Sequence, residues 1–84
     1  MNYEIKFKKK ALKFLASQSK EQQKRILLAI SHLPKGDIKN LQKYKDLFRL
    51  RVGDYRIIFM KQDNILEITV VDVGNRGQIY KSYR

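Results

Sequence analysis

The spacing of apolar residues changes once in the first sixteen positions. Apolar residues at first alternate with polar ones at Tyr3, Ile5 and Phe7, which predicts a short strand. The spacing then becomes i, i+4, i+7 and i+8, as on one face of a helix, at Phe7, Ala11, Phe14 and Leu15. We therefore expect a helix near residues 8–17. The lysines of residues 6–13 suit either its solvated side or a contact with phosphate groups.

A second helix is predicted to follow after a short link. Ser19 and Gln22 have the spacing of a capping box, in which each side chain binds the other residue's backbone N–H. The predicted buried stripe consists of Ile26, Leu27, Ile30 and Leu33. Pro34 and Gly36 should end this helix, so the two helices form an antiparallel hairpin.

The second half of the chain has the pattern of a small sheet. Residues 34–46 read as a basic connector that contains Lys35, Lys39, Lys43 and Lys45. After it, residues 48–59 read as a β-hairpin, and Asp63-Asn64 as another turn. Residues 65–73 are apolar on both sides near their end, which predicts the central strand.

The hairpin at residues 48–59 fixes its own register. Gly53-Asp54 is a two-residue turn with glycine first, which suits a type II′ turn. The predicted cross-strand pairs are Val52 with Tyr55, Arg51 with Arg56, Leu50 with Ile57, Arg49 with Ile58 and Phe48 with Phe59. One face is thus apolar. The other is expected to be open and to carry three arginines around Ile58, which favours a solvated face or, more strongly, an acidic or polyanionic partner.

The predicted fold class is α+β, in a single domain over residues 1–84. The expected element order is β-α-α-β-β-β, with a helical hairpin packed on a four-stranded, mainly antiparallel sheet. We expect the first strand to lie beside the long last strand.

Charge changes the picture more than length does. Among 84 residues there are 19 Lys and Arg against 8 Asp and Glu, a net charge of +11, which indicates a polyanionic or acidic partner. No cysteine, membrane-spanning run or signal peptide is apparent, so we expect a cytoplasmic protein without a membrane partner. One histidine and scattered acids show no metal-ligand spacing, so neither a metal nor another cofactor is expected.

Three segments together closely resemble the RelE/ParE superfamily of toxins from type II toxin-antitoxin systems. They are residues 50–59 (LRVGDYRIIF), residues 71–76 (VDVGNR) and residues 79–81 (IYK). The resemblance spans the chain and implies a toxin neutralised by a cognate antitoxin, monomeric within a hetero-oligomer. RelE-like members cut mRNA in the ribosomal A site without a metal, whereas ParE-like members inhibit DNA gyrase. The RelE-like branch, with ribosome and mRNA as partners, is the favoured interpretation.

The resemblance also implies roles for single residues. Arg56 matches the arginine that stabilises the scissile phosphate, and Arg76 the arginine assigned to the leaving group. Tyr80 matches the aromatic residue that stacks on an mRNA base. Arg49 takes the place of one of two functional lysines and Arg51 matches the basic residue two positions on, whereas Leu47 occupies the other lysine position.

The missing lysine leaves the general base open, because arginine holds its proton too tightly to serve as one. The candidates are Lys43, Lys45, Tyr80 and Tyr83. Further RNA contacts are expected from Arg51, Lys43, Lys45, Lys81 and Arg84.

Plainer interpretations stay open beside these roles. Arg76 could satisfy carbonyls of its own turn, Tyr80 could pack on the core, and His32 suits the end of the second helix. A ParE-like gyrase inhibitor and a basic module that only binds RNA or an acidic protein are the alternatives for the whole chain.

Overall fold

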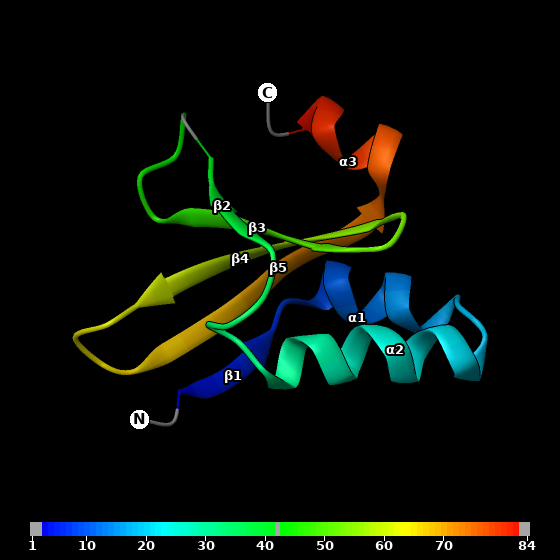
Figure 1. The fold of residues 1–84 in the computed structure, drawn as a ribbon, viewed down its shortest axis with the longest axis horizontal. Helices are drawn as coiled ribbons and strands as arrows, with labels where there is room; N and C mark the ends of the chain where they lie inside the picture. Colours follow the sequence, from blue (N-terminus) through cyan, green and yellow to red (C-terminus); the bar gives the residue numbers. More distant parts are fainter. Residues whose placement is uncertain (1–2, 42, 83–84) are drawn as a thin grey trace.

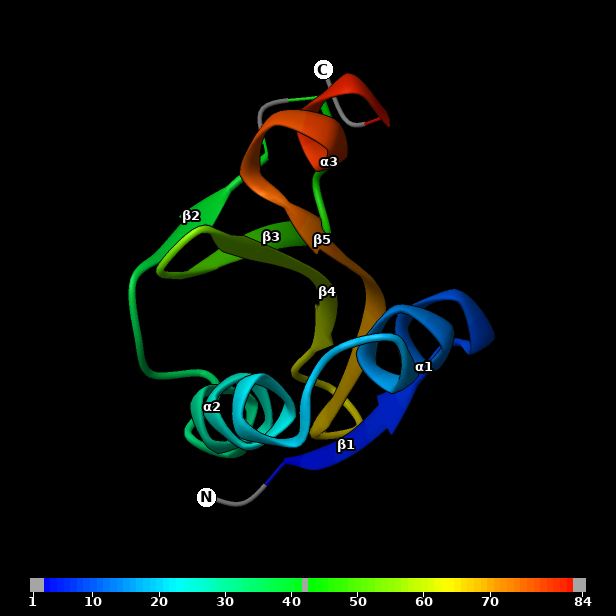
Figure 2. The ribbon, with the colours of Figure 1, turned by 90° about the vertical axis from the view of Figure 1, so that its right-hand side faces the viewer.

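The structure, a computed structural model, describes residues 3–41 and 43–82, with backbone but no side chains described at 80–82. The elements in chain order are β1 (Glu4–Phe7), α1 (Lys9–Ala16), α2 (Lys20–Ser31), β2 (Ile38–Asn40), β3 (Leu47–Val52), β4 (Tyr55–Gln62), β5 (Glu67–Asn75) and α3 (Arg76–Ser82). The strands form one sheet in the order β1-β5-β4-β3-β2. Helices α1 and α2 cover one side of it, here called the inner face, and α3 lies on the other, the outer face (Figures 1 and 2).

The α+β class is confirmed, but the predicted sheet was one strand short and the predicted order lacked a last helix. Residues 38–40 of the expected connector form β2, because Ile38, Lys39 and Asn40 pair with Leu50, Arg49 and Phe48 of β3. The expected turn at Arg76 is instead the start of α3. β1 lies beside β5 as predicted, in parallel, and β5 is an interior strand, although β4 occupies the centre.

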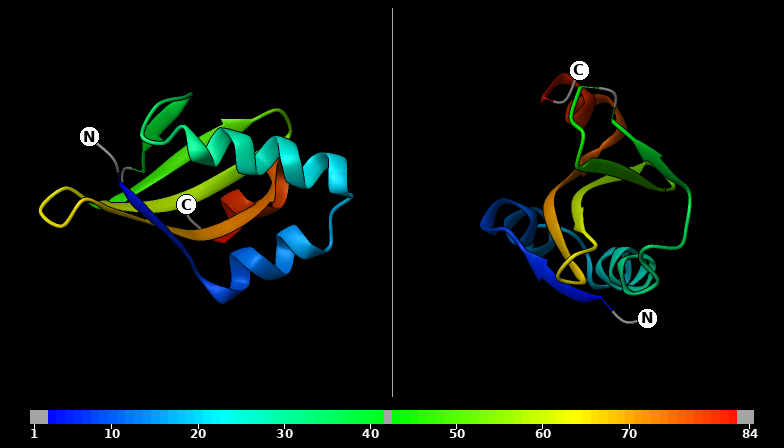
Figure 3. Two further views of the ribbon diagram at one scale, coloured as in Figure 1. Left: turned by 90° about the horizontal axis from the view of Figure 1, so that it is seen from below. Right: turned by 90° about the vertical axis from the view of Figure 1, so that its left-hand side faces the viewer.

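The helical hairpin forms as predicted, with two differences of detail (Figure 3). The Ser19 side chain accepts a hydrogen bond from the Gln22 backbone N–H at 3.3 Å, so the first half of the capping box is present. The Gln22 side-chain oxygen is buried without a hydrogen-bond partner, so the reciprocal bond to it is absent. Leu27 is 42% exposed, outside the buried stripe, because the part of α2 that faces the sheet is centred on Ile26 and Ile30.

The main core lies between the two helices and the inner face of the sheet. It includes Ala11 and Leu15 of α1, Ile26 and Ile30 of α2, and Leu50, Ile57, Phe59, Ile68, Val70 and Val73 of the strands. The outer face has two buried apolar side chains outside this cluster: Ile58 of β4 is fully buried, and Ile79 of α3 is 4% exposed. Ile79 packs over Gly74, where an added Cβ atom would lie 3.3 Å from its side chain. The last helix therefore docks where β5 presents bare backbone.

Candidate functional site: the basic outer face

The β3–β4 hairpin has the predicted register. Val52 pairs with Tyr55, Arg51 with Arg56, Leu50 with Ile57, Arg49 with Ile58 and Phe48 with Phe59. Gly53 has a φ of +58°, and Asp54 is not among the residues with positive φ, as expected for a type II′ turn. The three arginines and Ile58 therefore share the outer face.

Arg56 is buried rather than open to solvent, contrary to the expectation for this face. Arg56 is only 5% exposed. One terminal nitrogen, Nη1, donates to the carbonyl oxygens of Gly53 at 2.8 Å and Tyr55 at 2.9 Å. Its Nε is buried and has no hydrogen-bond partner. Arg56 therefore closes the hairpin turn and retains one buried donor that the described residues do not satisfy.

The same turn brings Arg76 next to Arg56. The Arg76 backbone N–H donates to the Asp54 carbonyl at 2.8 Å, so the two successive carbonyls of the turn are held by Arg56 and Arg76. Arg76 is exposed as the first residue of α3. The predicted pair of arginines, separated by twenty positions in sequence, is thus brought together by two residues of a tight turn.

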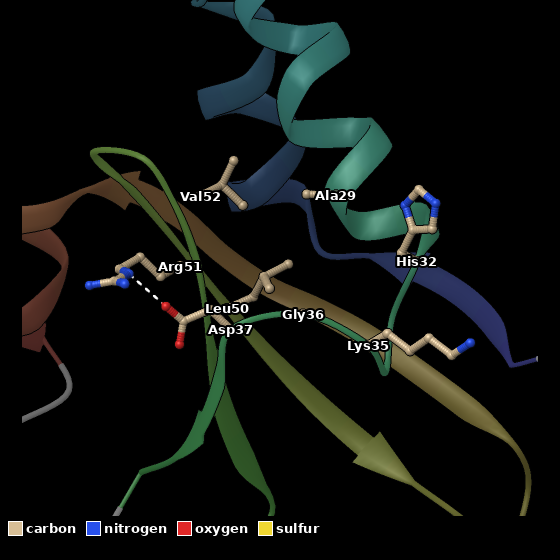
Figure 4. Close-up of a pocket in the computed structure, with 8 residues that line it drawn as sticks. All are labelled: Ala29, His32, Lys35, Gly36, Asp37, Leu50, Arg51 and Val52. Carbon is tan, nitrogen blue, oxygen red and sulfur yellow. Dashed lines mark ion pairs between the residues drawn. The ribbon is translucent and has the colours of Figure 1, made fainter.

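An aspartate from the connector partly neutralises the other two arginines. Asp37 Oδ2 lies 2.7 Å from Arg51 Nε (Figure 4). Asp37 Oδ1 lies 3.8 Å from Arg49 Nη1. The Arg49 side chain is 13% exposed, whereas that of Arg51 is 57% exposed. The face is therefore less uniformly basic than the alternation of the hairpin indicated, because its acid comes from a different segment.

A second aspartate lies on the outer face further along β5. Asp72 is the cross-strand partner of Ile58, next to a register shift between Ile58 and Phe59, and is 5% exposed. Its Oδ2 lies 3.1 Å from Nζ of Lys10 in α1. Neither Asp72 nor Lys10 was among the predicted site residues. The side of the sheet on which Asp72 lies depends on the register shift, which the sequence pattern does not reveal.

Arg25 of α2 was also missed. An added Cβ atom at Gly53 would lie 2.5 Å from one terminal nitrogen of Arg25, so the guanidinium of Arg25 rests against the turn. Arg25 is exposed, and it is the third arginine that meets this turn. Only the helical register of α2 places it there, and the sequence motif around the turn carries no signal for it.

The remaining predicted residues lie at different distances from the turn. Lys43 and Lys45 are exposed in the loop between β2 and β3. Tyr80 and Lys81 lie in α3, but their side chains are outside the described residues, as are Tyr83 and Arg84 altogether. His32 caps α2, and its Nδ1 lies 2.8 Å from the Leu28 carbonyl, a structural contact.

A groove of about 450 Å³ borders the arginine face at the end of α2 (Figure 4). Its floor is apolar, formed by Ala29, Leu50 and Val52. Its rim carries His32, Lys35 and Arg51 together with Asp37, the ion-pair partner of Arg51. In the described ranges, 3–41 and 43–82, no three His, Cys, Asp or Glu residues gather as they would around a metal ion. None of the helices described there is long and apolar enough to cross a membrane.

Comparison with known proteins agrees with this geometry. The family model described as "ParE toxin of type II toxin-antitoxin system, parDE" matches residues 5–80. The chain belongs to this toxin family of the RelE/ParE superfamily. The comparison with curated proteins found no match.

Solved structures place the toxin close to RelE proteins. A chain of the archaeal RelE–RelB complex from Pyrococcus horikoshii OT3 is 30% identical, with a TM-score of 0.76 over 93% of this chain and 99% of that chain. A chain of the RelB–RelE antitoxin–toxin complex from Methanococcus jannaschii is also 30% identical, with a TM-score of 0.73 over 94% and 99%. The isolated E. coli RelE toxin, 19% identical, shares the fold with a TM-score of 0.67 over 95% and 93%.

Proposed function

We propose that the toxin is a ribosome-dependent mRNA endoribonuclease that acts in the cytoplasm and stops translation. The observation that carries the proposal is the gathering of Arg56 and Arg76 at the turn of residues 53–54, on a face that also presents Arg49 and Arg51. Similarity to RelE toxins supports the same activity.

The reaction suits a site built from arginines. The 2′-oxygen of a ribose attacks the adjacent phosphorus, the P–O5′ bond breaks, and negative charge grows on the phosphorane between these two events. Guanidinium groups fixed in advance stabilise that charge, and loss of one such donor typically slows a reaction by about 100- to 1,000-fold. In this proposal Arg56 and Arg76 stabilise the phosphorane and the leaving oxygen. Arg49 takes the catalytic place of one of the two functional lysines, and Arg51 holds the RNA strand.

The unsatisfied Nε of Arg56 supports its role at a phosphate. A buried donor without a partner is uncommon in folded proteins and calls for an explanation. The Nε is covered, so the groups around it have to shift before a phosphate oxygen can satisfy this donor, while Nη1 keeps its bonds to the hairpin carbonyls. Arg56 would then serve both the turn and the substrate.

The proton on the 2′-hydroxyl needs a base other than arginine. Lys43 and Lys45 stay candidates from the loop between β2 and β3, and Tyr80 and Tyr83 from the C-terminal segment. Tyr80 is also the proposed stacking platform for an mRNA base, and Lys81 and Arg84 are proposed to contact RNA.

The deciding experiment is cleavage of mRNA on purified ribosomes that hold a defined codon in the A site. We expect cleavage by the wild-type toxin without added metal and a large loss with Arg76→Ala, an exposed position whose substitution should leave the fold intact. Intact mRNA with the wild-type toxin would overturn the proposal.

A second candidate function is inhibition of DNA gyrase, because the matching family model is that of ParE toxins. Gyrase inhibition does not need Arg56, Arg76 and Tyr80 as a group. A supercoiling assay separates the two functions: block of supercoiling together with intact mRNA on ribosomes would replace the nuclease by the gyrase inhibitor.

We also propose that a cognate, acidic antitoxin covers the basic outer face, since the similar archaeal proteins are described in complexes of RelE with RelB. The groove at the edge of this face has an apolar floor from the inner side of the sheet and three basic rim residues, with Asp37 paired to Arg51, and it suits an acidic segment with apolar side chains. Such binding should weaken as ionic strength rises. Affinity that does not change with salt would contradict electrostatic capture.

A further inference from the structure

Asp72 and Arg56 are the two buried charged residues of the described chain, and they lie close together. Arg56 pairs with Gly74 and Ile58 pairs with Asp72, so the two positions are two residues apart along the same strands. That separation is about 7 Å of strand length. A buried carboxylate is costly unless it is paired. The carboxylate of Asp72 therefore needs a cationic partner in this region of the sheet.

The geometry of the first strand brings Lys10 to Asp72. β1 pairs with β5 only as far as Phe7 and Val70, and the Lys8 backbone N–H then donates to the Val70 carbonyl at 2.8 Å. Helix α1 therefore begins beside the part of β5 that lies beyond Val70. Lys10 reaches Asp72 from there, with 3.1 Å between Nζ and Oδ2, while its side chain stays 66% exposed.

A cavity of about 180 Å³ adjoins this ion pair. Its lining includes Lys10 and Asp72 together with Gln78 of α3 and Gly74, the cross-strand partner of Arg56. The cavity thus connects the ion pair with the strand position opposite Arg56. Lys10 Nζ carries three N–H donors, so an anion in or near the cavity can be bound while the contact with Asp72 is kept.

We propose that Lys10 binds a phosphate of the RNA next to the scissile one, and that Asp72 is the positioning residue that holds Lys10 there. This inference rests on the proposed nuclease function and extends its binding site from the sheet to helix α1. The phosphate contact lies away from the reacting bond, so Lys10 acts in binding and not in the chemical step.

The first test compares Lys10→Met with Lys24→Met, which removes an exposed lysine from α2 and changes the net charge equally. We expect Lys10→Met to raise KM for programmed ribosomes at least tenfold with kcat changed less than threefold, and Lys24→Met to change KM less than twofold. For binding of a short single-stranded RNA to the free toxin, Lys10→Met should reduce the slope of log affinity against log salt by about 0.7. Equal effects of the two variants on KM and on the slope would overturn the proposal.

The second test separates positioning from simple stapling of α1 to β5. Asp72→Asn removes the carboxylate charge and keeps the shape, so we expect it to raise KM, with the double variant of Asp72→Asn and Lys10→Met no worse than Lys10→Met alone. Lys10→Arg keeps the charge and the ion pair, so it should retain most of the affinity for programmed ribosomes that Lys10→Met loses. If Lys10→Met and Asp72→Asn both lower Tm but leave KM unchanged at a temperature where both variants are folded, the ion pair is purely structural. That result would overturn the proposal. Absence of cleavage by the wild type would defeat the nuclease function, while the RNA slope would still decide the role of Lys10.

Discussion

The two faces of the sheet are built from alternate residues of the same strands, but they are organised in different ways. The inner face is mainly apolar and lies under α1 and α2, with Ile57 and Phe59 almost completely buried. On the outer face, buried Arg56, Ile58 and Asp72 are combined with exposed Arg51. Hydrophobic burial fixes the inner face, whereas specific pairings with turn carbonyls, aspartates and one lysine fix the outer face. The inner face should therefore determine stability and the outer face activity.

The largest expected effect comes from emptying the inner face. Phe59 is 1% exposed and stacks on Phe48, with 5.6 Å between ring centroids. Phe59→Ala should lower the free energy of unfolding by about 3–5 kcal/mol, because it removes apolar contacts and leaves a cavity. Urea denaturation measures this loss. Cleavage per folded molecule should stay within a few-fold of wild type, and a specific loss of activity at full folding would break the division between the faces.

The next comparison uses Arg56 and Arg51, direct cross-strand partners with opposite exposure. Arg56→Ala should lower the free energy of unfolding by about 1.5–3 kcal/mol, because it removes the charge-assisted hydrogen bonds of a buried guanidinium to two backbone carbonyls. Arg51→Ala should cost less than about 1 kcal/mol, since its ion pair is exposed. Urea denaturation of both variants checks this.

Arg56→Lys sharpens the same comparison through activity. Lysine keeps the charge but loses the planar set of donors, so we expect mRNA cleavage to fall by about 100-fold or more if Arg56 contacts the phosphate. The assay is single-turnover cleavage on programmed ribosomes, with Arg51→Lys as the matched control. Wild-type rates for Arg56→Lys would assign Arg56 to the turn alone.

The variant Asp37→Asn tests the aspartate that partly neutralises Arg49 and Arg51. Its removal frees Arg51 and Arg49 from an ion pair, so binding of a single-stranded RNA should become several-fold tighter at about 50 mM salt and this gain should shrink at about 200 mM. Stability should change by less than about 1 kcal/mol, because Asp37 is half-exposed. Fluorescence anisotropy gives the affinities. Weaker binding would show instead that Asp37 orients the arginines.

The smallest expected effect lies at the opposite end of β4 from the arginine turn, where Tyr3 donates a hydrogen bond to Asp63 at 2.5 Å. The hydrogen bond from Tyr3 and the nearby Lys61 hold the pKa of Asp63 below its usual value. The ionised carboxylate therefore adds stability above its unfolded pKa, and this contribution is lost as pH falls through the lower folded pKa. Wild type and Asp63→Asn should differ slightly in Tm at neutral pH and converge in strong acid. A difference that persists in strong acid would assign the effect to something other than this carboxylate.

The sequence predicted what depends on local chemistry. Gly53-Asp54 determines the turn type, and the turn type determines the register and so the face of every hairpin residue. The β2 strand escaped prediction because three residues, Ile38–Asn40, are too few to show a period. Helix α3 escaped because its stability comes from packing over Gly74, which no local pattern reports.

The candidate site could be predicted only in part for the same reason. The contact of Arg56 and Arg76 with one turn was within reach, because that turn was visible in the sequence, while their functional roles stay a prediction. The burial of Arg56 depends on the outer-face packing around it, and the partners Asp37 and Lys10 come from segments remote in sequence. Hydrophobic alternation predicts which side of a sheet a residue takes, but not which distant charge will meet it there.

The parallel pairing of β1 with β5 has a consequence for the synthesis of the toxin. Glu4 pairs with Glu67, so β1 cannot join the sheet until β5 has been synthesised. Contacts so distant in sequence also form slowly. Arg76 follows later still, and it reaches the Asp54 carbonyl only after β5 has been made. A nascent chain therefore carries all the arginines of the hairpin long before it can arrange them with Arg76. The ribosome that makes the toxin must therefore translate past residue 76 before the arginine turn can be completed.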